Sequence, residues 1–169
     1  CGSFSKTLAP GLRVGWVCAA SPVIGRLVLM KQAADLHSST INQMAIHAVA
    51  AAGFDAQVAK IRTTYSARRD AMLTALAAHM PAGVSWTHPE GGMFIWVTLP
   101  AHLDGAELLA QSLHSERVAF VPGRAFYADG SGGNTLRLSF SRADEAAIDE
   151  GMKRLGALVR RQAPPGPGS

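Results

Sequence analysis

Apolar residues recur along the chain at two different spacings, and these spacings predict its helices and strands. The longest periodic segment runs from Phe54 to His79, where apolar side chains follow one another at steps of three, four or seven residues. These are Val58, Ile61, Tyr65, Met72 and Leu76. Such steps place side chains on one face of a helix, so the pattern predicts one long amphipathic helix.

A strict alternation follows much later in the chain, between Thr135 and Ser141. Apolar Leu136, Leu138 and Phe140 alternate there with polar Arg137 and Ser139. Successive side chains of a strand point to opposite faces. The segment is therefore predicted to be a strand with one buried face and with Arg137 on the other face.

The remaining elements are predicted from apolar runs, caps and turn residues. Further strands are expected at residues 12–19 (a buried strand), 84–86, 93–99 and 118–121. Further helices are expected at residues 21–36, from residue 39 or 40 to 53, at 105–115, and from residue 141 or 144 to 161. Ser21 and Asp104 are the expected N-caps, and Gly53 is the expected stop. This order predicts an α/β or α+β subdomain after the long helix. We expect residues 1–53 to end one domain, residues 54–161 to form the linking helix and a second domain, and the Pro- and Gly-rich residues 162–169 to be disordered.

Composition excludes several classes of protein. The chain of 169 residues is 48% hydrophobic and 17% charged, an ordinary globular balance that argues against disorder. No apolar run approaches the roughly 18 residues of a membrane span, so no membrane partner is expected. The net charge of +4 is not gathered into a basic block, so no nucleic-acid partner is expected either.

The cysteines indicate the cellular compartment of the protein, and the first residues indicate whether the chain is part of a longer protein. Cys1 and Cys18 exclude a disulfide scaffold, and no residues show zinc-ligand spacing, so no metal is expected. Two free thiols in a reducing cytosol are the expected state, and a bridge between them stays open. The chain opens directly on a compact loop of the kind that a scaffold normally positions. We therefore expect a C-terminal fragment of a longer protein.

That opening loop, GSFSKTLAPGLRVG from Gly2 to Gly15, carries the main candidate chemistry. Its one lysine, Lys6, lies between small hydroxyl residues, and Arg13 follows seven positions later. A nucleophilic lysine needs a dry pocket in which its amine can be neutral. Hydroxyls and a guanidinium can bind a phosphate, and the turn at Pro10 could bring Arg13 back toward Lys6. The combination suits a cofactor that carries an aldehyde and a phosphate; the alternative is a surface loop with one solvated lysine.

The same residues resemble the pyridoxal-phosphate lysine motif of class I and II aminotransferases, in GSFSK (2–6) followed by PGLRVG (10–15). The resemblance implies pyridoxal 5'-phosphate as the cofactor and Lys6 as the catalytic residue that binds it as a Schiff base. Residues implied to bind the cofactor with Lys6 are Ser3, Ser5 and Arg13. The wording of the motifs most resembles the 2-aminoadipate and aromatic aminotransferase branch.

A second site residue follows from the same resemblance. Arg137 matches the C-terminal arginine that binds the substrate carboxylate in this family, and a planar guanidinium suits a carboxylate because two parallel hydrogen bonds fix its orientation. The alternative is an ordinary strand arginine, exposed or paired with Glu90 or Asp129.

The resemblance spans Gly2 to about Arg161 and implies an α/β fold of type I: the end of the large domain, the linking helix and the small domain. It implies transfer of an amino group from an L-amino acid to a 2-oxo acid by a ping-pong mechanism, in a cytoplasmic homodimer. The isolated chain would be inactive, because the residues that stack on the cofactor ring and pair with its nitrogen lie upstream in such enzymes. Two alternatives stay open: the cofactor-binding domain of a MocR-type transcription regulator, and a fold type I lyase or decarboxylase.

Overall fold

The computed structural model describes residues 1–162, which form two compact units. Unit 1 comprises Cys1–Thr63 and unit 2 begins at Thr64. Helix α2 (Thr40–His79) contributes to both units. Each unit is described by itself below, and the domain limits expected from the sequence stay a prediction.

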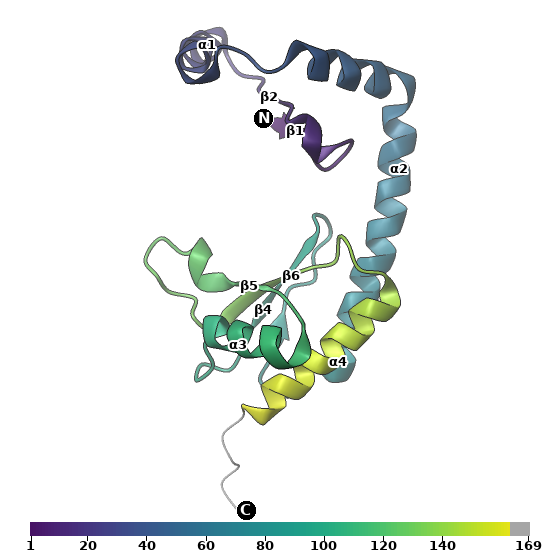
Figure 1. The fold of residues 1–169 in the computed structure, drawn as a ribbon, viewed down its shortest axis with the longest axis vertical. Coiled ribbons are helices and arrows are strands. Elements are labelled where there is room, and N and C mark those ends of the chain that lie inside the picture. The colour runs from purple at the N-terminus through teal and green to yellow at the C-terminus, as the bar shows by residue number, and fades with distance from the viewer. Residues whose placement is uncertain (163–169) are drawn as a thin grey trace, which may run out of the picture. The chain divides into compact units, whose positions relative to one another are not determined.

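Unit 1 is built from two very short strands and two helices (Figure 1). Strand β1 (Gly2–Ser3) pairs antiparallel with β2 (Gly15–Trp16), and a 3-10 turn, η1 (Pro10–Leu12), lies between them. The predicted buried strand over residues 12–19 is therefore wrong beyond β2, and Trp16 is 52% exposed. An apolar run becomes a buried strand only where neighbours cover it, and β2 pairs with two residues of β1 alone.

The two helices of unit 1 begin where the pattern predicts, although their ends differ in detail. Helix α1 spans Ser21–Asp35, but Ser21 is already helical, and the cap position is Ala20, which makes no side-chain capping bond. Within α2 the backbone leaves helical geometry at Gly53, with φ −176° and ψ 35°, and the helix then resumes. Gly53 therefore kinks α2 between its two predicted segments and does not end it.

Unit 2 is a four-stranded antiparallel sheet covered on one face by helices. The strand order is β3 (Ser85–Trp86), β4 (Phe94–Thr98), β6 (Thr135–Ser139), β5 (Val121–Pro122). The predicted alternation along β6 is confirmed, because Leu136 and Leu138 are at most 2% exposed whereas Arg137 faces away from them and is half-buried. The buried face joins one core with residues of α2, α3 (Gly105–Gln111) and α4 (Glu145–Arg161).

Two acidic caps start the helices of unit 2. The Asp104 carboxylate accepts hydrogen bonds from Ala106 N and Glu107 N at 2.8 and 3.3 Å, and these bonds lower the pKa of Asp104. The Asp144 carboxylate accepts from Ala147 N at 2.8 Å. The predicted helices after these residues are confirmed, with the first ending earlier than expected.

At Ser112 helix α3 gives way to a π-helical turn, η2 (Ser112–Glu116). This turn also explains why the predicted strand at residues 118–121 is wrong before Val121. Val118 N donates to Ser112 O at 3.3 Å, and Ser112 Oγ donates to Val118 O at 2.7 Å. The backbone of Val118 closes the turn and is therefore not paired in the sheet.

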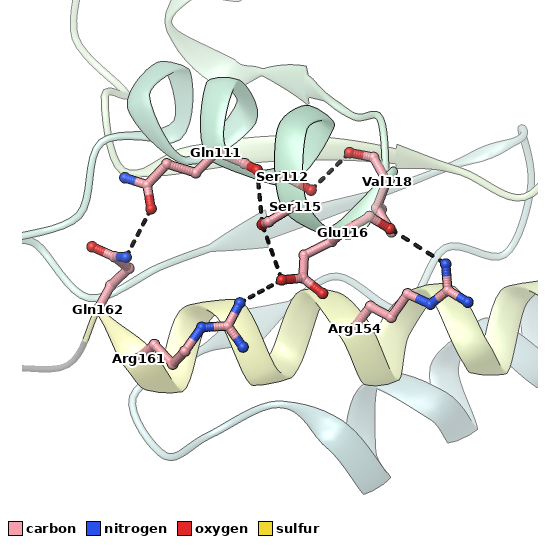
Figure 2. Close-up of polar contacts among 8 residues, drawn as sticks. All are labelled: Gln111, Ser112, Ser115, Glu116, Val118, Arg154, Arg161 and Gln162. Atoms are coloured by element: carbon pink, nitrogen blue, oxygen red, sulfur yellow. Dashed lines mark hydrogen bonds and ion pairs between the residues drawn. The ribbon is translucent and has the colours of Figure 1, made fainter.

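A polar network joins η2 to α4 (Figure 2). The Glu116 carboxylate accepts hydrogen bonds from Arg161 and from Ser115 Oγ, and Arg154 reaches Glu116 O. The bond from Arg161, followed by that from Ser115, lowers the pKa of Glu116. The network fixes the last helix of the unit beside the turn.

Among residues 1–162, no helix combines the length and the apolar character that crossing a bilayer requires. The expected disordered tail, 162–169, lies outside the described residues except for Gln162.

Candidate active site

Lys6 lies in a turn that main-chain hydrogen bonds close. Phe4 N donates to Val14 O at 3.1 Å, and Phe4 O accepts from Leu8 N and Ala9 N at 2.9 and 3.1 Å. The base of the loop is tightly packed, because a Cβ on Gly2 would lie 2.7 Å from the ring of Trp16. The side chain of Lys6 is exposed, so the residues of this chain hold the lysine in a fixed turn but do not by themselves form the dry pocket expected for it.

Hydroxyl groups surround this turn. Ser3 Oγ accepts a hydrogen bond from Ser5 N at 3.1 Å, which leaves the Ser3 O–H free to donate. Thr7 Oγ1 is buried and has no hydrogen-bond partner among residues 1–162. Buried hydroxyls are normally satisfied, so this one marks a place where a further polar group fits. The sequence reasoning did not single out Thr7, although its position directly after Lys6 was a usable signal.

Arg13 follows the 3-10 turn η1 in the left-handed backbone region, at φ 53° and ψ 42°. This conformation costs an ordinary residue roughly 1 kcal/mol. Arg13 Nη1 donates to Pro10 O at 3.1 Å, and the side chain is otherwise exposed. The expected turn at Pro10 is present, and the approach of Arg13 to Lys6 stays a prediction. Asn42 Nδ2 on α2 donates to Leu12 O at 3.0 Å and holds the end of this loop.

A hollow of unit 1 is distinct from these polar groups. It has a volume of about 780 Å³ and is lined mostly by small and aliphatic side chains of the 8–12 loop and of α2, among them Leu8, Leu12, Ile46 and Val49. None of Ser3, Ser5, Lys6 and Arg13 lines it. The candidate phosphate-binding groups therefore lie in the loop and do not line this hollow.

Arg137 lies in unit 2, on the inner strand β6, where it pairs in register with Trp96 of β4 and Val121 of β5. Neither Glu90 nor Asp129, the acidic partners of the alternative, forms an ion pair with it, and the Asp129 carboxylate accepts from Ser131 N at 3.0 Å. The Arg137 Cζ lies 4.0 Å from the ring centroid of Phe94 and 4.7 Å from that of Phe126. Arg137 Nε is buried without a hydrogen-bond partner among the described residues.

The sequence reasoning missed Phe94 and Phe126. Phe94 could have been found from its place on the same strand face as Trp96, two residues away. Phe126 lies at the end of η3 (Gly123–Phe126), a 3-10 turn that the sequence indicated only as a turn.

Comparisons with known proteins identify the family of the chain. A family model described as aminotransferase class I and II matches residues 1–155. A 2-aminoadipate transaminase of Thermus thermophilus is 45% identical over 159 residues, which cover 94% of this chain and 40% of the relative. An aromatic-amino-acid aminotransferase of Thermococcus litoralis is 44% identical over 162 residues, which cover 95% of this chain and 39% of the relative.

A solved structure gives the same result. The α-aminoadipate aminotransferase of Thermus thermophilus, crystallised with N-(5'-phosphopyridoxyl)-L-leucine, matches with a TM-score of 0.90 and 44% identity. The match covers 94% of this chain and 41% of that chain. The likeness shows that this chain has the α/β fold of the type I enzymes.

A regulator also matches, at lower identity. An uncharacterized HTH-type transcriptional regulator of Bacillus subtilis is 33% identical over 163 residues, which cover 96% of this chain and 33% of the relative. The chain thus spans between a third and two fifths of the length of these curated relatives. Because the family model covers nearly the whole chain, from residue 1 to residue 155, the chain belongs to the class I and II aminotransferase family.

Proposed function

We propose that the protein containing this chain is a pyridoxal-phosphate-dependent aminotransferase that moves an amino group from an L-amino acid to a 2-oxo acid. The observation that carries the proposal is the Lys6 loop, which presents an amine, free hydroxyls and a guanidinium within residues 2–15 of a chain of this family. Arg137 adds a guanidinium without a counter-ion among the described residues.

The donors in the loop fit the cofactor. A phosphate needs several hydrogen-bond donors and a cation, which Ser3, Ser5 and Arg13 would supply. The unpaired hydroxyl of Thr7 supports a polar group close to the same turn. When bound, pyridoxal phosphate supplies an aldehyde that exchanges with amines and a ring that withdraws electrons from the substrate.

Lys6 would be the residue of this chain that binds the cofactor covalently and transfers the proton. Its Nζ would first hold the cofactor and, once displaced by the substrate amine, would be free to take the α-proton as a general base and to deliver it as a general acid. This role requires a neutral amine, and the exposed Lys6 of this chain would need to be covered by other parts of the protein. The first 2-oxo acid would leave while the amino group stays with the protein, and the second 2-oxo acid would then bind and take it up, an order that gives ping-pong kinetics.

Arg137 would orient the substrate. Two parallel hydrogen bonds from its Nη atoms to the α-carboxylate would fix the α-hydrogen relative to the base, which lowers the barrier by positioning. Since the amino acid and the 2-oxo acid both carry this carboxylate, the same contact would serve both half-reactions.

Reductive trapping tests the assignment of Lys6. Borohydride treatment of the full-length protein, followed by peptide mass spectrometry, is expected to leave the cofactor on the peptide that contains Lys6. Lys6→Ala is expected to abolish the adduct, whereas the control Lys31→Ala, a lysine paired with Asp35 at 2.7 Å, is expected to keep it. An adduct that survives Lys6→Ala contradicts the proposal.

Cofactor titration tests the phosphate site. Losing a charge-assisted hydrogen bond costs about 1.5–3 kcal/mol, so Arg13→Ala is expected to weaken cofactor affinity by a factor of about ten or more. The matched control is Arg26→Ala, on α1. Equal affinity of the Arg13 variant and the parent protein would remove Arg13 from the site.

The regulator alternative is supported by the 33% identical relative. A product assay decides between the classes: a 2-oxo acid formed with a matching amino product indicates transamination, whereas released ammonia or carbon dioxide indicates a lyase or decarboxylase. Sequence-specific DNA binding without turnover indicates the regulator. For the whole protein we further infer a cytoplasmic homodimer from the family resemblance alone, which light scattering of the full-length protein and cell fractionation test.

A further inference from the structure

Two aromatic rings, Phe94 and Phe126, contact the guanidinium of Arg137, and we call them the aromatic clamp. Their ring centroids lie 4.0 and 4.7 Å from Arg137 Cζ. A cation within about 6 Å of a ring centroid is attracted to the ring, and arginine can also stack on it. Both rings are themselves partly open to solvent, at 38% for Phe94 and 49% for Phe126. Neither ring therefore belongs to the core of unit 2.

Strand pairing places these residues together. Trp96 of β4 is directly opposite Arg137 of β6, so both lie on one face of the sheet, and Phe94 shares that face because it is two residues from Trp96. This is the face opposite the buried Ile95 and Leu138. The clamp thus stands on the side of the sheet that faces away from the core.

Phe126 reaches the clamp from a turn that is packed unusually closely on the sheet. Its ring meets Trp96 edge-on, with centroids 5.4 Å apart at 78°. The turn starts at Gly123, where a Cβ would lie 1.8 Å from Thr135 Oγ1 and 2.9 Å from the Trp96 ring. Only glycine allows this approach, so the position of Phe126 is built into the sequence of the turn.

The clamp leaves one part of Arg137 available. Nε is buried and unpaired, whereas no described residue accepts a hydrogen bond from either terminal Nη atom. A bidentate carboxylate needs both Nη atoms held in one plane and one direction. Contact with two rings restricts rotation of the guanidinium and so favours a single direction for those atoms.

We propose that Phe94 and Phe126 are positioning residues that hold the Arg137 guanidinium ready for end-on, bidentate binding of a carboxylate. The proposal rests on the function proposed above, in which that carboxylate is the α-carboxylate of the substrate. Removal of a ring then weakens binding of the amino acid and of the 2-oxo acid alike, because both carry this group. The chemical step at Lys6 changes less.

The test uses the full-length, cofactor-loaded protein and the variants Phe94→Leu and Phe126→Leu, which keep apolar volume but remove the ring. An exposed cation–π contact is worth enough for a KM increase of about twofold to fivefold for one ring, and for a larger increase in the double variant. The expected change in kcat is less than twofold. Competitive inhibition by propionate, a carboxylate without an amino group, is expected to weaken by the same factor as KM rises.

Three controls separate positioning from damage to the fold. Phe94→Tyr and Phe126→Tyr keep the ring and are expected to restore KM. Tyr127→Leu removes a neighbouring ring whose centroid lies 6.2 Å from that of Trp96 but over which the Arg137 guanidinium does not stack, so KM is expected to change less than twofold. Thermal unfolding of each variant is expected to follow that of the parent protein.

The variant Arg137→Gln distinguishes failure of the aromatic clamp from failure of the proposed role of Arg137 in binding the substrate. If Arg137→Gln leaves KM unchanged, Arg137 does not bind the substrate and the proposed assignment of this residue fails. If Arg137→Gln raises KM while both leucine variants leave KM and propionate inhibition unchanged, the clamp proposal alone is overturned. A fall in kcat at constant KM in the leucine variants also overturns it.

Discussion

Units 1 and 2 differ in how many of their apolar side chains they bury. In unit 2, residues of β4, β6, α2, α3 and α4 close one core, whereas Ile46 is the one hydrophobic residue of unit 1 that is buried. Helix α1 has no buried residue, and even its apolar side chains Leu29 and Met30 are 58% and 67% exposed. A helix that is apolar on all sides belongs in a buried environment. The sequence of unit 2 therefore specifies a self-sufficient fold, and that of unit 1 specifies surfaces that need further cover.

The two candidate site residues differ in the same way. Arg137 lies on the inner strand β6 of unit 2, where strand pairing and contacts with two aromatic rings hold it in place. Lys6 stands in a loop that main-chain hydrogen bonds hold, in a unit with little buried surface. We expect the surroundings of Arg137 to be complete in the chain alone, whereas Lys6 gains the cover that a dry pocket needs only within the whole protein.

The largest expected difference concerns independent folding. A fragment of residues 54–162, which starts after the kink at Gly53, is expected to unfold cooperatively in urea, because it contains the whole core of unit 2. A fragment of residues 1–63 is expected to show no cooperative transition. Tryptophan fluorescence follows both, through Trp86 and Trp96 in the first fragment and Trp16 in the second. A cooperative transition in the shorter fragment would break the comparison.

Matched leucines give the next largest contrast. Leu155 on α4 is 1% exposed, so Leu155→Ala is expected to lower the free energy of unfolding by about 2–5 kcal/mol through the cavity it leaves. Leu29→Ala on α1, at 58% exposure, is expected to change it by less than about 0.5 kcal/mol in this chain. Urea titration of both variants measures the difference. If the whole protein covers α1, the cost of Leu29→Ala rises there, which sharpens the comparison.

Two helical glycines provide a smaller contrast of opposite sign. A Cβ on Gly156 would lie 2.1 Å from His79 O, a main-chain atom, so Gly156→Ala forces α4 away from α2 and is expected to cost about 1–3 kcal/mol. Gly25 on α1 has no atom within 4 Å of such a Cβ, so Gly25→Ala is expected to stabilise the helix by up to about 1 kcal/mol. The thermal midpoint of unit 2 should fall in Gly156→Ala, whereas circular dichroism should show more helix in Gly25→Ala. A stabilising Gly156→Ala would contradict the packing described for unit 2.

The smallest expected effect is a dependence on pH confined to unit 2. The hydrogen bond from Arg161 lowers the pKa of Glu116 below its usual 4.5, so the ionised carboxylate stabilises the folded state at neutral pH. This contribution is present above pH 4.5 and is lost as the pH falls through the lowered pKa. Glu116→Gln is therefore expected to be less stable than the parent at pH 7 and to approach it at lower pH. Urea midpoints from pH 7 to pH 3 measure this, and a constant gap would remove Glu116 from the pH response.

Sequence reasoning succeeded where a pattern is local and is decided by one buried face. The alternation of β6, the acidic cap of α3 and the long helix after Gly53 are of this kind. It failed at residues 12–19 because an apolar run does not say whether neighbours will cover it. It failed at Val118 because the hydroxyl of Ser112, six residues earlier, donates to Val118 O, which a strand would use for pairing.

The candidate site shows the same limit. The motif residues were found because their types and spacing are local in sequence. The aromatic clamp was missed because it depends on which residues pair between β4 and β6, some forty positions apart, and on a turn whose packing depends on Gly123. Contacts of that kind are set by tertiary structure and leave no short-range signal.

The attachments of α4 reach far back along the chain. Arg160 Nη1 donates to His79 O at 2.7 Å across 81 residues, and Arg161 bonds to Glu116 across 45 residues. Leu155, Leu158 and Val159 of the same helix complete the core. Contacts between residues so distant in sequence slow folding, since the intervening chain must be ordered first. During synthesis the part of the apolar face that α4 covers therefore stays open until α4 has left the ribosome, and a chaperone that binds exposed apolar strands has that interval in which to act.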